Sequence, residues 1–243
     1  MEIHIAGDID ELSTSVADWM VAYMNQTLQQ QDRFTLVLSG GSTPEKLHRL
    51  LASDAYKNEV DWSKVHIFWG DDRFVPFNDD RNNAKMAFDT LLNYVAVKQE
   101  NIHVMQTENI SPEDSASAYE KILSEYFSDG ATNTFDLVLL GMGDDGHTLS
   151  LFPGKKEVIY ETQKQCTSLW LEAQDMYRIT LTHGIVNRAS RIAFLTAGPK
   201  KAHALYEVLR GDYNPDVYPS QIIKPVNGEL HWFVDKAAAA QLL

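Results

Sequence analysis

The residues of this sequence that are best suited to chemistry fall in three short clusters, at 39–43, 71–73 and 144–147. Each cluster closely follows an apolar run that is typical of a buried strand. In open α/β sheets, ligands bind beyond the carboxyl ends of the strands. If the sheet is mostly parallel, all three clusters lie at one edge of it. Their convergence indicates a functional site more strongly than any single cluster does.

The third cluster lies in the segment GMGDDGHT and contains a histidine among glycines, His147. An imidazole with an unperturbed pKa of about 6.5 suits general-base work near neutral pH. Asp144 or Asp145 could orient the ring, whereas the alternative is a glycine-rich turn with an incidental histidine. The string at 141–146 also fits GxGxxG. We reject a dinucleotide fingerprint there, because Pro153 follows and no long helix is expected.

The first cluster, SGGSTP, predicts a turn followed by a helix with Pro44 at its first position. Two glycines let the backbone approach a ligand closely, and a helix N-terminus with nearby hydroxyls can hold a phosphate. The segment fits neither the P-loop nor the dinucleotide motif. An ordinary turn before a capped helix is the alternative, and the local pattern leaves both open.

The second cluster combines two carboxylates with a guanidinium. Asp71 and Asp72 could act as general bases and Arg73 as an anion clamp, or the three could form a solvated ion pair at the end of a strand. Other basic residues that could reach the same edge are Arg178 and the lysine pair at 200–201. The pattern alone does not choose between them.

Expected strands and helices alternate along the whole chain. Strands are expected at 3–5, 34–38, 65–69, 101–105, 135–140, 166–173, 178–181, 192–198 and 230–234. Helices are expected at 12–30, from 44 onward, at 83–92, after Ser111, at 185–189, at 200–209 and in the alanine-rich end. This order predicts one α/β domain over residues 1–243, a three-layer α/β/α sandwich with a mostly parallel sheet.

Composition excludes several classes of protein. The formal net charge of -13 disfavours binding to nucleic acid or to anionic membranes. Cys166 is the one cysteine, so an internal disulfide and a thiolate zinc cluster are ruled out, and a reducing cytoplasm is the expected location. The N-terminus does not read as a secretory signal, and no stretch reaches the roughly 18 apolar residues of a membrane helix. The other histidines form no recognisable metal motif.

The sequence resembles the 6-phosphogluconolactonases, the lactone hydrolases of the oxidative pentose phosphate pathway. The matching segments span nearly the whole chain. They include LSGGSTP at 38–44, GDDRFVP at 70–76, FDLVLLGMGDDGHTLSLFPG at 135–154, RITLT at 178–182, GPKKA at 198–202 and WFVDKAAA at 232–239. The resemblance implies a Rossmann-like α/β/α sandwich and a sugar-phosphate lactone as substrate. We expect neither a cofactor nor a metal.

The resemblance also implies roles for individual residues. His147 would be the general base, and Asp145 or a nearby carbonyl would fix its tautomer. Arg73 would stabilise the oxyanion or clamp the phosphate, and Asp71 would belong to the same catalytic group. The phosphate would be held by Gly40, Gly41, Ser42, Thr43, Arg178 and Lys201. Two small departures from the family pattern, Asp72 in place of glutamate and Ser220 in place of alanine, do not threaten these expectations.

The mechanism that these residues suggest is direct attack of water on the lactone carbonyl. His147 would take the proton of the water and return it to the ring oxygen as that oxygen leaves. No covalent nucleophile is required. Ser150 is a poor candidate for one, because no GxSxG elbow surrounds it.

Two other functions are kept as alternatives. Glucosamine-6-phosphate deaminases share the GGSTP and DGH elements, but they carry an asparagine-containing segment where this chain has SLFP at 150–153. In such an enzyme Asp71 would shuttle a proton and His147 would assist ring opening. A non-catalytic sugar-phosphate sensor is the third possibility, although such modules usually act through an attached DNA-binding domain. The sequence does not fix the oligomeric state, and a monomer is favoured.

Overall fold

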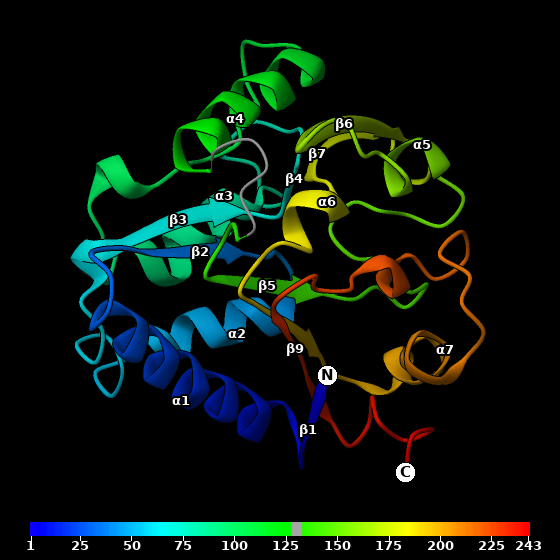
Figure 1. The fold of residues 1–243 in the computed structure, drawn as a ribbon, viewed down its shortest axis with the longest axis horizontal. Coiled ribbons are helices and arrows are strands. Elements are labelled where there is room, and N and C mark those ends of the chain that lie inside the picture. Colours follow the sequence, from blue (N-terminus) through cyan, green and yellow to red (C-terminus); the bar gives the residue numbers. More distant parts are fainter. Residues whose placement is uncertain (128–132) are drawn as a thin grey trace.

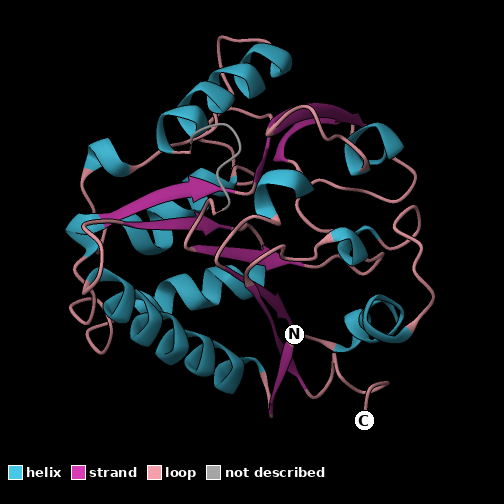
Figure 2. Ribbon diagram, in the orientation of Figure 1, coloured by secondary structure: helices cyan, strands magenta, loops and turns pink. Residues whose placement is uncertain are grey.

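The computed structural model describes residues 1–127 and 133–243. A six-stranded sheet lies between two layers of helices (Figures 1 and 2). Every pair of neighbouring strands in it is parallel. The predicted three-layer α/β architecture is therefore confirmed. In spatial order the strands are β1 (Glu2–Ala6), β9 (Glu229–Asp235), β8 (Arg191–Thr196), β5 (Leu137–Gly141), β2 (Phe34–Leu38) and β3 (Val65–Trp69).

Two hydrophobic cores, one on each face of this sheet, explain why the central strands β2 and β5 are almost entirely apolar. Successive residues of a strand point to opposite faces, so Val37 enters one core while Leu36 and Leu38 enter the other. The core with Leu36 is closed by α1 (Ile9–Leu28), α2 (Ser42–Leu51) and α3 (Asn83–Ala87). The opposite core is closed by α4 (Pro112–Tyr126), α5 (Lys156–Ile159), α6 (His183–Val186) and α7 (Ala202–Arg210).

A second, antiparallel sheet is present that the sequence analysis did not predict. It contains β4 (Asp71–Arg73), β7 (Met176–Leu181) and β6 (Cys166–Leu171), in that order. A single residue, Gly70, separates β4 from the end of β3. The turn at this residue leads the chain from one sheet into the other. The apolar pattern of a strand does not reveal which sheet it joins. The register places Arg73 opposite Arg178, which brings two distant motifs together.

Two of the expected elements are wrong. Residues 101–105 form no strand, because Ile102 makes only an isolated bridge to Ile67 after a 3₁₀ turn. The alanine-rich end forms turns in place of a helix. In the part of the chain that the structure describes, no helix is long and apolar enough to cross a membrane.

His48 on α2 should make the free energy of unfolding depend on pH. It is fully buried, and burial lowers its pKa to about 4. The unfolded chain therefore binds a proton first, near its ordinary pKa of about 6.5. The stability due to neutral His48 is complete above that pH and is lost as the pH falls towards 4.

We expect this loss to amount to about 3 kcal/mol of unfolding free energy between pH 7 and pH 4. Urea unfolding at the two pH values measures it. His48→Met places an apolar side chain that cannot be protonated at this buried position. The variant should therefore lose about 3 kcal/mol less unfolding free energy than the parent between pH 7 and pH 4. An equal loss in His48→Met and the parent would contradict the assignment.

Candidate active site

The order of the strands marks a place for a ligand. From β2 the chain proceeds to β3 on one side, and then to β5, β8 and β9 on the other. The sheet order therefore reverses between β2 and β5, and ligands of open α/β sheets bind beyond the carboxyl ends of strands at such a point. The arrowheads of both strands point to the right in Figure 1. The loops that follow them hold the first and third clusters of the sequence.

A pocket of about 240 Å³ opens at this edge of the sheet. The loops after β2 and β5 line it together with β4, β7 and the turn that precedes α7. The structure thus brings together residues as far apart in the sequence as Ser39 and Lys201. The predicted site residues that line it are Gly40, Gly41, Asp71, Arg73, His147, Arg178 and Lys201.

Three predicted site residues lie outside the lining of this pocket. Ser42 is exposed and borders a neighbouring hollow, which it shares with Gly41 and Arg73. Thr43 is half-buried in the first turn of α2. Asp145 reaches the pocket only through its contact with His147.

His147 and Asp145 form a close pair in the loop after β5. The Asp145 Oδ1 atom lies 2.6 Å from Nδ1 of His147 and also accepts the backbone N–H of His147. Burial opposes ionisation of Asp145, but the hydrogen bonds and charge of His147 outweigh it and hold the pKa of Asp145 below its ordinary value. With Nδ1–H donated to this carboxylate, Nε2 is the nitrogen free to accept a proton. Phe152 packs against the ring at 4.3 Å between centroids.

Glycines make this loop possible. The Gly143 N–H donates to the carbonyl of His147, which closes the turn. A Cβ at position 143 would lie 2.0 Å from Nδ1 of His147 and 2.4 Å from Oδ1 of Asp145. Gly146 has a φ of 78°, a left-handed conformation that favours glycine. The close approach of imidazole and carboxylate therefore depends on a missing side chain at Gly143.

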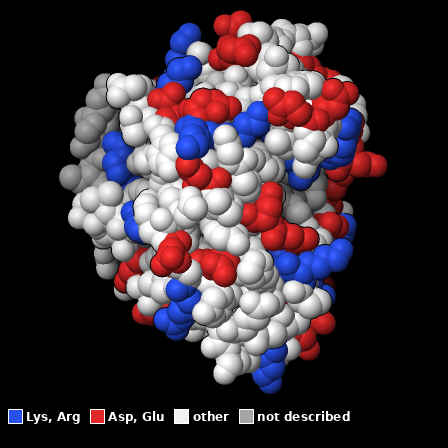
Figure 3. Space-filling model, turned by 90° about the vertical axis from the view of Figure 1, so that its right-hand side faces the viewer, with Lys and Arg blue, Asp and Glu red and all other residues white. Residues whose placement is uncertain are grey.

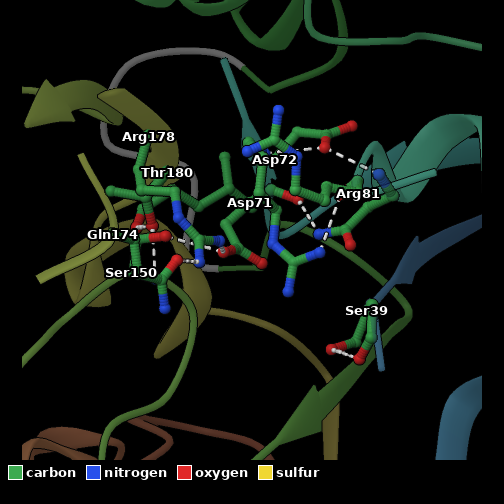
Figure 4. Close-up of polar contacts among 12 residues, drawn as sticks. Ser39, Asp71, Asp72, Arg81, Ser150, Gln174, Arg178 and Thr180 are labelled. Carbon is green, nitrogen blue, oxygen red and sulfur yellow. Dashed lines mark hydrogen bonds and ion pairs between the residues drawn. The ribbon is translucent and has the colours of Figure 1, made fainter. Parts of the chain in front are cut away.

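Arg178 and Asp71 form a buried polar group on the antiparallel sheet (Figure 4). One guanidinium nitrogen of Arg178 lies 3.5 Å from Oδ2 of Asp71, and another donates to Gln174. The hydroxyl of Ser150 donates to the same Asp71 oxygen at 2.6 Å. This contact of Ser150 was not predicted from the sequence. The SLFP segment that separates the two related families was the available signal.

Asp72 does not line the pocket, although the sequence left it open as a base. It is fully buried and accepts backbone N–H groups of Arg73, Asn83 and Ala84, so it anchors the start of α3. Burial is the main reason that the pKa of Asp72 is raised to about 7. We assign Asp72 to the structure of β4 and α3.

Asn83 is a pocket residue that sequence reasoning missed. Its side-chain N–H donates to the carbonyl of Asp71, and a Cβ at Gly40 would lie 1.9 Å from its oxygen. Asn83 thus packs directly against the loop after β2. It is the first residue of α3, where an asparagine is ordinary, so no local signal could have found it.

Positive charge reaches the pocket from three directions. The Arg73 guanidinium donates to the carbonyl of Arg81, and Lys201 forms an ion pair of 2.5 Å with Asp144. The Nε–H groups of Arg73 and Arg178 are buried with no partner among the described residues. Figure 3 views this side of the molecule and shows acidic and basic side chains interspersed. The pocket therefore concentrates cations on a chain whose net charge is -13.

Comparison with known proteins gives consistent results. The family described as glucosamine-6-phosphate isomerases/6-phosphogluconolactonase matches residues 7–232. A 6-phosphogluconolactonase of Nostoc sp. is 37% identical over 99% of this chain and 98% of its own length. The crystal structure titled devB protein has a TM-score of 0.91 at 31% identity, covering 100% of this chain and 99% of that one. A monomeric glucosamine-6-phosphate deaminase shares the fold, with a TM-score of 0.83 at 18% identity and 99% of both chains covered.

Proposed function

The chain belongs to the glucosamine-6-phosphate isomerases/6-phosphogluconolactonase family, and from this premise we propose that it hydrolyses 6-phospho-D-glucono-1,5-lactone to 6-phosphogluconate in the oxidative pentose phosphate pathway. The observation that carries the proposal is the pairing of His147 with Asp145 at a pocket lined by cationic side chains. Hydrolysis of this substrate requires a base beside an anion site, and the pocket offers both. The relative from Nostoc sp. that bears the name of this activity spans almost the whole chain.

His147 performs the proton transfers in the proposed reaction. Its Nε2 takes a proton from water as the water oxygen attacks the lactone carbonyl carbon. The imidazolium that forms is stabilised by the Asp145 carboxylate at 2.6 Å. When the tetrahedral intermediate collapses, the bond from the carbonyl carbon to the ring oxygen breaks, and His147 returns the proton to that oxygen. No covalent intermediate is needed.

The phosphate is proposed to lie at the N-terminus of α2. Gly41 precedes this helix with a φ of 104°, and no side chain caps the N–H groups of the first turn. Such N–H groups, together with the positive end of the helix dipole, favour an anion. Arg73 borders both the pocket and the hollow beside Gly41, so its guanidinium is placed to contact the same phosphate.

The surroundings of Asp71 favour hydrolysis over deamination. A proton shuttle must be free to exchange protons with the substrate. Here one oxygen of Asp71 accepts the hydroxyl of Ser150 and lies near Arg178. We propose that Asp71 acts as a fixed anion that positions Arg178. The likeness to the deaminase is a likeness of fold alone, so it does not favour that second function.

The decisive experiment follows lactone loss directly. The lactone is generated in situ from glucose 6-phosphate with its dehydrogenase, and its disappearance is compared with and without the protein. Acceleration over the buffer rate supports the proposal, and no acceleration overturns it. Ammonia release from glucosamine 6-phosphate, measured in parallel, would instead favour the deaminase.

The ion pair at the mouth of the pocket provides a test of phosphate binding. If Lys201 contacts the phosphate, Lys201→Gln should raise KM about tenfold, as expected for one charge-assisted hydrogen bond. Asp144→Asn should lower KM by up to about fivefold, because it releases Lys201 from an exposed ion pair. Lys200→Gln, a neighbouring exposed lysine outside the pocket lining, is the matched control. Equal KM values in all three variants would remove Lys201 from the phosphate site.

A further inference from the structure

A cluster of histidines and glutamates lies on the first and last strands of the sheet, away from the proposed active site. Glu2 and His4 are two residues apart on β1, and Glu229 and His231 are two residues apart on β9. Residues i and i+2 of a strand point to the same face. The parallel register places Glu2 opposite His231. Because these positions precede the carboxyl ends of both strands, the cluster lies apart from the edge of the sheet that carries the pocket.

Three atoms of this cluster have the spacing of metal ligands. Nε2 of His4 lies 3.2 Å from Nδ1 of His231. Oε2 of Glu2 lies 3.5 Å from that Nδ1 and 3.8 Å from Nε2 of His4. Ligand atoms about 2.0–2.1 Å from a tetrahedral zinc ion are separated by about 3.3 Å. We propose that Glu2, His4 and His231 bind one zinc ion, with the fourth position left to water.

The second nitrogen of His231 supports this assignment. Its Nε2 lies 3.3 Å from Oε2 of Glu229, and the same oxygen is held by Arg191 at 2.7 Å. If Nε2–H donates to Glu229, Nδ1 presents a lone pair to His4 and Glu2. Metal-bound histidines are commonly oriented by such a carboxylate. Without a metal, the Nε2–H of His4 can donate to this lone pair across 3.2 Å, and a zinc ion would replace that proton and use the same lone pair together with Glu2.

Neighbouring aromatic rings hold the two imidazoles in place. Phe233 stacks on His4, with centroids 4.3 Å apart and planes inclined by 11°. Trp19 of α1 packs against His231 at 4.8 Å. The His231 side chain is only 4% exposed, whereas that of Glu2 is 68% exposed, so an ion can enter from the solvent on that side. The ligands come from opposite ends of the chain, which explains why no local motif predicted a metal.

Zinc titration of the full chain tests the site. Protein stripped with EDTA and desalted is titrated with ZnCl₂ in competition with a chromogenic chelator, and thermal unfolding is followed in parallel. We expect one tightly bound zinc per chain and a higher Tm with zinc. MgCl₂ should have neither effect, because magnesium prefers oxygen ligands. Failure of the parent chain to bind zinc would overturn the proposal.

Variants locate the binding. His4→Gln, at a partly exposed position that should tolerate the change, is expected to lose at least about 100-fold in zinc affinity. Glu229→Gln should lose about 10–100-fold through reorientation of His231. His183→Gln, a half-buried histidine outside the cluster, should bind zinc as the parent does. Affinity in His4→Gln equal to that of the parent would place the zinc elsewhere and refute the site.

Lactonase activity separates this proposal from the proposed function. His4→Gln should hydrolyse the lactone at the parental rate, whereas His147→Ala should bind zinc normally and lose turnover. Loss of zinc affinity in His147→Ala would assign the metal to the pocket and refute the site on β1 and β9. Absence of lactonase activity in the parent would refute the proposed function alone.

Discussion

Replacement of His147 by alanine is expected to lower kcat for the lactone by about 10²–10⁴-fold, the range for loss of one general acid–base group. KM should stay near the parental value, because the proposed phosphate contacts come from the loop after β2 and from Arg73, not from the imidazole. Initial rates over a range of lactone concentrations, corrected for spontaneous hydrolysis, separate the two constants.

A second histidine provides the control for this prediction. His203 on α7 lies 3.4 Å from the hydroxyl of Tyr218 and does not line the pocket. His203→Ala should keep kcat within about twofold of the parent, as expected for a side chain that takes no part in proton transfer. If His147→Ala retained the parental kcat, the proposed mechanism would be wrong even though the protein bound the substrate.

A methyl group at Gly143 is the second change with a large expected effect. The new Cβ would lie 2.0 Å from Nδ1 of His147. The imidazole must therefore move, and its hydrogen bond to Asp145 must break. Displacement of a catalytic group by about 1 Å can cost about 10²-fold in rate. Because the displaced groups are side chains with exposed atoms, we expect Gly143→Ala to fold normally, to keep its Tm and to lose about 10²-fold in kcat.

Gly141 in the same segment is the matched control for Gly143. A Cβ there would meet nothing closer than 3.7 Å, and its φ is not positive. Gly141→Ala should therefore retain most of its activity. The double variant Gly143→Ala/His147→Ala should be no slower than His147→Ala alone, because both changes disable one group. A further loss in the double variant would indicate that Gly143 serves a second purpose.

Local sequence was informative wherever the relevant contacts are local. His147 and Asp145 are two residues apart, so the composition of one loop predicted their pairing. The loop at 39–43 could be predicted in the same way, because a strand, a turn and a helix start follow one another in the chain. Each of these two loops is formed by one continuous segment of the chain.

Contacts between distant segments could not be predicted. Nothing near Arg178 indicates that it pairs with β4, and the SLFP segment at 150–153 draws attention to Ser150 without indicating Asp71 as its partner. Asn83 falls in the same category, since its partner is a loop more than 40 positions earlier. These contacts depend on how the two sheets are joined at Gly70. The apolar pattern of a strand does not indicate which of the two sheets it joins.

The place of β9 in the sheet also sets an order of assembly. β9 lies between β1 and β8, and it is the only neighbour of β1 among the described strands. β1 therefore cannot pair until β9 has been synthesised, and closing so long a loop is slow. Until then β8 presents an open edge, to which another unfinished chain could add a strand. The protein is thus most prone to aggregation before β9 has been synthesised.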